Sequence, residues 1–323
     1  MRNRNRVNRA VRVMLGVMTA CCASIASGPS LRLALEVTTD TFVEGEPVEA
    51  RLVIANEGSE PAEVLLQYPS LRALGTGGLR LRIPEASENP KLAESFGRWT
   101  QIMPLAAGGQ WAGKVYLQRY MAAPPAGRHA IPYSLEIAFR AAGAPGSETS
   151  VAHQDGVLAF AVAPASPEKL AAAIERYVTG FESTGYWQQR FAVEALSLIR
   201  DPAVVPHLAE LLRAGWTGPA FEALASFAEN AEAREIVLAA ANSKRPVEAI
   251  PALEVLGRWR YSMDLHDLQV LLADEVPAVR RAALHYIQSA GRRDCLGLVA
   301  PLTQDADPAV SDEARRTRTF LEK

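Results

Sequence analysis

Residues 274–284, with the sequence DEVPAVRRAAL, contain the pattern that decides the fold, and it returns 31 residues later as DADPAVSDEAR at 305–315. Each copy places an aspartate three residues before a proline and a valine two residues after it. Proline is tolerated in the first turn of a helix because its missing N–H has no partner there. An acidic residue stabilises the same helix end by its charge. Each copy therefore predicts a helix that begins at the proline and turns the valine into a core.

An Ala-Leu pair inside these stretches recurs along the second half of the chain. It begins at Ala195, Ala223, Ala252 and Ala283, and a weaker copy at Ala314 has arginine in place of leucine, so the spacings are 28, 29, 31 and 31 residues. A small or apolar residue stands twelve positions before each of the last four alanines: Leu211, Ala240, Leu271 and Leu302. A fixed offset within a fixed period is typical of one helix-turn-helix unit that is stacked repeatedly.

Five helical hairpins are expected from this pattern. Ser166 is expected to cap the first helix, with Pro167 at its first position. The fifth hairpin carries Arg315, Arg316 and Arg318, as a terminal repeat with a polar outer face requires. The expected helices are 169–179, 188–199, 204–213, 219–228, 232–241, 246–257, 265–273, 277–290, 296–303 and 308–321.

The Asp-x-x-Pro-x-Val turn before an Ala-rich helix resembles HEAT repeats, particularly the short bacterial kind that is also found in phycobilin lyases. The resemblance covers residues 166–323. It implies an α-solenoid, and it implies a scaffold that holds a protein or peptide partner, since most members have that role.

Residues 30–163 have a different character, because apolar and polar residues alternate with period two, as in half-buried strands. About seven short strands separated by Gly and Pro clusters predict an antiparallel β-sandwich. The motif Phe42-x-Glu44-Gly45-Glu46-Pro47-Val48 and the later Gly127-Arg128-His129-x-Ile131-x-Tyr133 resemble bacterial immunoglobulin-like domains. The expected strands are 31–37, 48–56, 62–68, 79–83, 110–118, 129–139 and 157–162, and a stiff linker at 164–167 leads into the solenoid at 168–323.

The first 27 residues are typical of an export signal. Five arginines and no acidic residue precede a short apolar run at 13–18, which is too short to span a bilayer. Two cleavage sites fit: before Cys21, which would then carry a lipid and attach the protein to a membrane, or after Ala26. An uncleaved basic tail is the remaining interpretation. After removal, 34 − 5 = 29 basic residues face 36 acidic ones, which argues against nucleic acid as a partner.

Catalytic and metal-binding patterns are not found in the sequence. None of the five histidines is paired with another at the spacing that places two ligands on one helix face. Cys295 follows Arg292 and Arg293, which would lower a thiol pKa, but a core cysteine is the preferred interpretation. We therefore expect no cofactor, no metal and no enzymatic activity.

The second helix of each hairpin is the expected partner-binding surface. If the Ala-Leu pair faces the core, Arg281, His285 and Gln288 lie on the opposite side of the fourth hairpin's second helix, with Glu254 at an equivalent place in the third. Aromatic and arginine side chains are common interface anchors, so three further candidates are included: Trp216, Trp259 and Tyr261. Packing between repeats is the alternative role for these residues, and Trp187 is expected in the core of the first hairpin.

Three functions remain open at this level. The first is an exported, non-enzymatic scaffold or adaptor, in the periplasm or cell envelope, that binds a protein or peptide partner through the repeats. The second is a carbohydrate- or cell-wall-binding module that uses aromatic residues of the sandwich: Trp99, Trp111, Tyr116 and Tyr120. Trp111 and Tyr116 differ by an odd number of positions, which places them on opposite faces of a regular strand. The third is a lyase-like enzyme.

Overall fold

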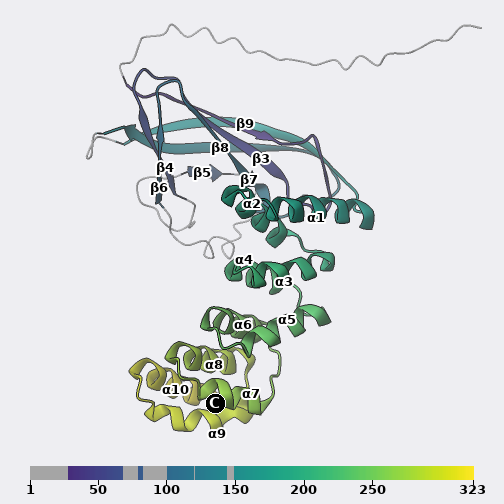
Figure 1. Cartoon of the computed structure of the whole chain (residues 1–323), viewed down its shortest axis with the longest axis vertical. Coiled ribbons are helices and arrows are strands. Elements are labelled where there is room, and N and C mark those ends of the chain that lie inside the picture. Colours follow the sequence, from purple (N-terminus) through teal and green to yellow (C-terminus); the bar gives the residue numbers. More distant parts are fainter. Residues whose placement is uncertain (1–27, 68–78, 83–99, 120, 144–148) are drawn as a thin grey trace, which may run out of the picture.

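The computed structural model describes residues 28–67, 79–82, 100–119, 121–143 and 149–323. Two β-sheets occupy one end of the molecule and a stack of helices extends from them to the C-terminus (Figure 1). The expected fold class, a β-sandwich followed by helical hairpins, is confirmed. The predicted export signal at 1–27 lies outside the described residues.

The β-sandwich contains nine strands in the described part of the chain. One sheet has the order β1-β3-β7, and the other has the order β2-β9-β8-β4-β6, with β5 paired to β8. All strand pairs are antiparallel except β2 with β9, which is parallel. The strands are β1 (Leu31–Val37), β2 (Thr41–Val43), β3 (Glu49–Asn56), β4 (Ala62–Gln67), β5 (Leu79–Arg82), β6 (Thr100–Leu105), β7 (Gln110–Tyr116), β8 (Gly127–Ala141) and β9 (Ser150–Ala163).

Strands β2 and β6 were not expected from the sequence. β6 contains Pro104, which cannot donate a hydrogen bond to a neighbouring strand, and the structure places this strand at the edge of its sheet. β9 begins seven residues earlier than the expected 157–162, through a polar segment around His153. Between the sheets, alternate side chains pack into one apolar core, where the Phe42 and Phe160 rings meet edge to face at 5.8 Å.

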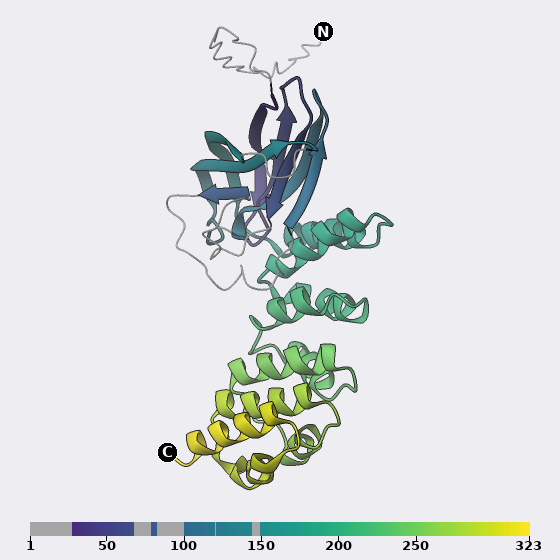
Figure 2. The ribbon, with the colours of Figure 1, turned by 90° about the vertical axis from the view of Figure 1, so that its left-hand side faces the viewer.

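Ten helices form five consecutive hairpins after β9. Helices of one hairpin pack together, and the second helices α2, α4, α6, α8 and α10 also pack against one another in that order. Figure 2 shows the hairpins as successive layers. The helices are α1 (Pro167–Phe181), α2 (Tyr186–Leu198), α3 (Val205–Arg213), α4 (Thr217–Leu224), α5 (Ala231–Ala241), α6 (Pro246–Trp259), α7 (Leu265–Leu272), α8 (Pro277–Ala290), α9 (Leu296–Val299) and α10 (Pro308–Leu321).

The prediction of a helix over 296–303 was wrong in its length. Only four residues form α9, and short 3-10 turns precede and follow it (Arg293–Cys295 and Ala300–Gln304). Pro301 explains the change, because it supplies no N–H for the next α-helical hydrogen bond.

The expected helix starts at Pro167, Pro277 and Pro308 are confirmed, with one difference in how they are made. Ser166 accepts a hydrogen bond from the Lys169 N–H, and Pro167 is the first residue of α1. Asp274 and Asp305 do not cap α8 and α10 directly; each accepts the N–H two residues later and closes the turn. Arg280 then joins the two turns, because its guanidinium donates to both carboxylate oxygens of Asp305 at 2.7 and 2.9 Å and to the Asp274 carbonyl. This pair lowers the pKa of Asp305.

Candidate functional site: the exposed face of the second helices

The repeated alanine marks the side of each second helix that faces the core. Ala195, Ala223, Ala252, Ala283 and Ala314 are all 0% exposed. On α6, α8 and α10 the opposite side of the helix faces outward, as expected. We use the name second-helix face for the outward side chains of α6, α8 and α10.

Four of the sequence-predicted residues lie on this face. Glu254 on α6 and Arg281 and His285 on α8 are exposed, and Gln288 is half-buried. The second-helix face does not continue into the first two hairpins. The position of Arg281, two before the repeated alanine, is occupied there by the buried Val193 and Phe221. The candidate surface is thus confined to the last three hairpins.

The three aromatic candidates make contacts within the stack instead. Trp259 is half-buried, and its Nε1 donates to the Ala225 carbonyl at 2.8 Å, so it joins α6 to the end of α4. The Tyr261 carbonyl accepts a hydrogen bond from the Tyr286 hydroxyl at 2.5 Å. These contacts agree with the alternative role that the sequence left open, packing between repeats.

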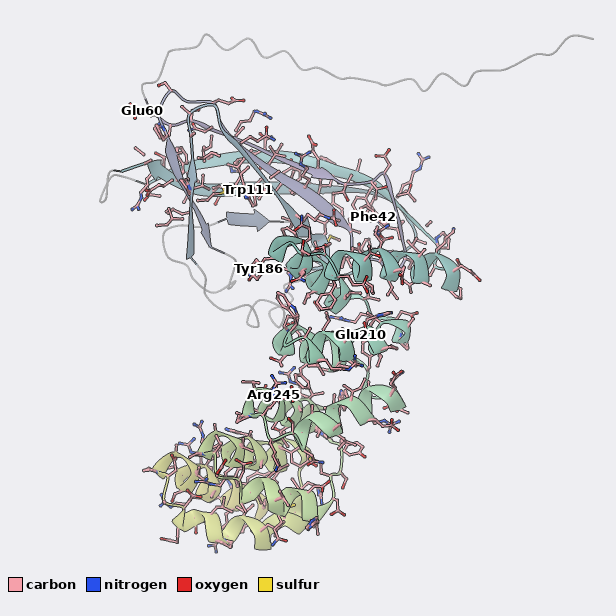
Figure 3. The ribbon with its side chains drawn as sticks, in the orientation of Figure 1. Phe42, Glu60, Trp111, Tyr186, Glu210 and Arg245 are labelled. Carbon is pink, nitrogen blue, oxygen red and sulfur yellow. The ribbon has the colours of Figure 1, made fainter. Side chains whose placement is uncertain are left out.

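Trp216 stands at the turn between α3 and α4, and its ring stacks on Tyr186 with centroids 6.3 Å apart. Tyr186 is 55% exposed, so this pair reaches the surface. Figure 3 shows Tyr186 and Arg245 on the same side of the stack, where the second helices begin. The Trp187 side chain lies outside the described residues.

Two residues near the second-helix face were missed from the sequence: Glu313 and Thr317 on α10. Both are buried, at 5% and 0% exposure, and Gln288 donates to the Thr317 hydroxyl at 3.1 Å. Glu313 Oε1 lies 3.4 Å from Gln288 Nε2 and 3.5 Å from His285 Nδ1, and Arg316 approaches its other oxygen at 3.4 Å. A signal was present, since Glu313 directly precedes the repeated alanine, where the fourth hairpin has Ala282.

The aromatic residues suggested for sugar binding do not form a common platform among the described side chains. Tyr116 is 1% exposed, and Trp111 folds over Gly113, where a β-carbon would lie 2.2 Å from the indole ring. The other two residues, Trp99 and Tyr120, lie outside the described residues.

Cys295 is buried and has 0% exposure. Burial raises the pKa of its thiol to about 11, and Arg292 opposes this shift without cancelling it. The alternative of a reactive thiol with a lowered pKa is therefore wrong. Within the described ranges, no group of three or more His, Cys, Asp or Glu side chains is placed to hold a metal ion.

No helix in the described part of the chain has both the length and the apolar character needed to cross a lipid bilayer.

No protein-family model matches the chain, and no curated protein matches it. Among solved structures, an engineered protein is similar over 47% of this chain and 80% of its own, with 19% identity and a TM-score of 0.35. An E. coli α-2-macroglobulin and a Salmonella α-2-macroglobulin mutant are similar over 90% of this chain, with 15% and 13% identity and TM-scores of 0.22 and 0.23. This chain spans only about a fifth of those two proteins, 21% and 22% of their lengths. No functional conclusion follows from likenesses at such low TM-scores.

Proposed function

We propose that the chain is an exported, non-enzymatic scaffold or adaptor, and that its HEAT-like stack binds a protein or peptide partner through the second-helix face. The observation that carries this proposal is the exposed set Glu254, Arg281 and His285. These charged and titratable side chains share one surface on α6 and α8, and the buried core does not depend on them.

Arg281 is the strongest anchor candidate on this surface. It is exposed on α8, and no ion pair joins it to another described residue. Arginine is enriched among the residues that dominate binding energy at interfaces, because its planar head donates several hydrogen bonds at once. A partner carboxylate or carbonyl would supply an acceptor for Arg281, which forms no ion pair with another described residue.

The HEAT-type and immunoglobulin-like assignments belong to the same proposal. The turn pattern, the Arg280–Asp305 contact between successive turns and the stacking of second helices support the first. Two packed sheets with a parallel β2–β9 pair support the second.

Site-directed photo-crosslinking in the envelope fraction tests the proposed surface. A photo-crosslinking residue replaces Arg281 in one variant and Val270 in the control, since Val270 is 58% exposed on the first helix α7. We expect a specific adduct from position 281 that is absent from position 270. Arg281→Ala should then weaken binding of the captured partner by about 1 kcal/mol or more, a fivefold or larger change in Kd.

Two results would count against the proposal. One is a set of identical adducts from both positions, which would indicate non-specific contact. The other is an Arg281→Ala variant that binds the captured partner with unchanged affinity.

A further inference from the structure

The sandwich and the helical stack meet through a dense set of polar contacts at α1 and α2. Arg119, which follows β7, donates to the Glu194 carboxylate on α2 at 2.5 Å, and both side chains are largely buried. Arg176 on α1 pairs with Glu46, a carboxylate that is 6% exposed in the turn after β2. The charges of Arg119, Glu194 and Glu46 are largely buried, and a buried charge is costly unless it is paired, so each region supplies the partner of a buried charge in the other.

Tyr116 is the last residue of strand β7, whereas its side chain packs among the helices. Its ring is 1% exposed within the apolar core of the stack and meets Tyr177 of α1 edge to face at 6.5 Å. Its hydroxyl donates to the Phe191 carbonyl at 3.0 Å. Burial, with a smaller contribution from Glu49, raises the pKa of Tyr116, so the hydroxyl stays protonated as a donor.

The Arg119–Glu194 contact follows a pattern that is found at the same position in other hairpins. In three hairpins the residue directly before the repeated alanine is a glutamate: Glu194, Glu222 and Glu313. In the fifth hairpin Glu313 faces α8. There Gln288, five residues after the repeated Ala283, donates a hydrogen bond to the Glu313 carboxylate at 3.4 Å. Arg200 holds the same place relative to Glu222. Burial lowers the pKa of Arg200, and the Glu222 carboxylate opposes that shift.

The remaining layers replace the polar pair by small residues. The positions that would hold the glutamate are Pro251 and Ala282, and those that would hold its donor are Ala228 and Gly257. A β-carbon at Gly257 would lie only 3.0 Å from the Ser289 side chain on α8, so α6 and α8 approach closely at this point. This pair of positions thus carries a donor and a carboxylate between α2 and α4 and between α8 and α10, and apolar residues between α4 and α6 and between α6 and α8.

Glu194 has no helical layer before it, and Arg119 of the sandwich takes the donor's place. We infer that the β-sandwich serves as the layer preceding the first hairpin, so that sandwich and stack form one rigid body with a fixed relative orientation. The second-helix face is then held in one position relative to the sandwich. This inference does not depend on the proposed function.

Spin-label distance measurements on the full chain test the rigid arrangement. Val157→Cys on β9 and Val270→Cys on α7 provide exposed labelling sites on the two regions, in a chain in which serine replaces Cys21 and Cys22, and native Cys295 is buried. We expect one narrow distance distribution. A broad or multiple distribution would overturn the inference, because a flexible hinge would then separate the regions.

Hydrogen exchange on α1 and α2 tests the specific role of the Arg119–Glu194 pair. Arg119→Gln and Glu194→Gln should each accelerate amide exchange in these helices by about tenfold, and the double variant should add little. Glu322→Gln is the matched control, since it breaks the exposed Arg318–Glu322 pair by the same chemical change. Tyr116→Phe, which removes only the hydroxyl contacts, should accelerate exchange in the same helices and would decide the matter if the charge variants fail to fold. Unchanged exchange in α1 and α2, or fully additive effects of Arg119→Gln and Glu194→Gln, would refute the assignment.

Discussion

At the scale of single residues, burial decides the chemistry of side chains that the sequence leaves ambiguous. Arg292 and Arg293 both lie close to Cys295 in the sequence. Of these two arginines only Arg292 lowers the pKa of the thiol, and burial raises that pKa by more. Arg292 is held elsewhere, because its guanidinium donates to both oxygens of Asp294 and to the Met263 carbonyl. A sequence shows which charges are near in the chain, whereas the structure shows which charges are already paired.

We predict that Cys295 reacts slowly with thiol reagents in the folded protein. With its pKa raised to about 11, the thiolate fraction at pH 8 should be roughly a hundredfold below that of an ordinary cysteine. The alkylation rate should rise steadily with pH, and Cys295→Ser supplies the background from any other thiol. A rate that levels off near pH 7 would contradict the prediction.

The raised pKa of Cys295 also makes the stability of the folded protein depend on pH. A thiol whose pKa is higher in the folded state favours folding while it is protonated. That contribution is complete below the unfolded pKa of about 8.5 and is lost as the pH rises towards 11. The pH dependence of unfolding between these values should therefore be smaller in Cys295→Ser.

At the scale of elements, the helical hairpins could be predicted because their sequence pattern repeats, whereas strands without a repeating pattern could not. The hairpin pattern was confirmed because the same alanine is buried in every layer. The edge strand β6 and the short strand β2 were missed because strand pairing depends on partners far away in the chain, and a three-residue strand has no period to detect. For the candidate site, the exposed positions on α8 followed from helix geometry. The packing of Trp259 did not, since its acceptor is a carbonyl of the second hairpin.

Replacing a repeated alanine by a larger residue should destabilise the stack. Ala283 is 0% exposed on α8, which packs against α6, α7 and α10, so the two extra methyl groups of Ala283→Val must displace neighbours. We expect a loss of about 1 to 3 kcal/mol in the free energy of unfolding, measured by chemical denaturation. Ala278→Val on the same helix is the control, because Ala278 is exposed. Equal losses in the two variants would show that helix propensity, and not packing, is responsible.

At the scale of the whole molecule, the sandwich separates the start of the described chain, at Gly28, from the helical stack. The described chain starts beside the turn after β3, where the Ser30 N–H binds the Asn56 side chain. The buried Asn56 also donates to the Glu60 and Ala106 carbonyls. Figure 3 shows Glu60 at the end of the sandwich away from the helices, and Phe42 near α1. A lipid on Cys21 would be attached seven residues before Gly28, where the described chain begins at the end of the sandwich.

The proposed export of the protein can be tested by identifying the N-terminus of the mature protein. Mass spectrometry of the mature protein from native membranes should find one of two N-termini: an acylated Cys21, or a free end near Ser27. If Cys21 is acylated, Cys21→Ser should release the protein from the membrane fraction without changing its thermal stability, because the anchor precedes the folded sandwich. A free end near Ser27 would keep the protein extracytoplasmic and direct the partner search to periplasmic or secreted proteins. An intact Met1 would contradict export and, with it, the envelope partner proposed for Arg281. The rigid joint at Arg119 and Glu194 would still stand, because its contacts lie wholly within the described chain.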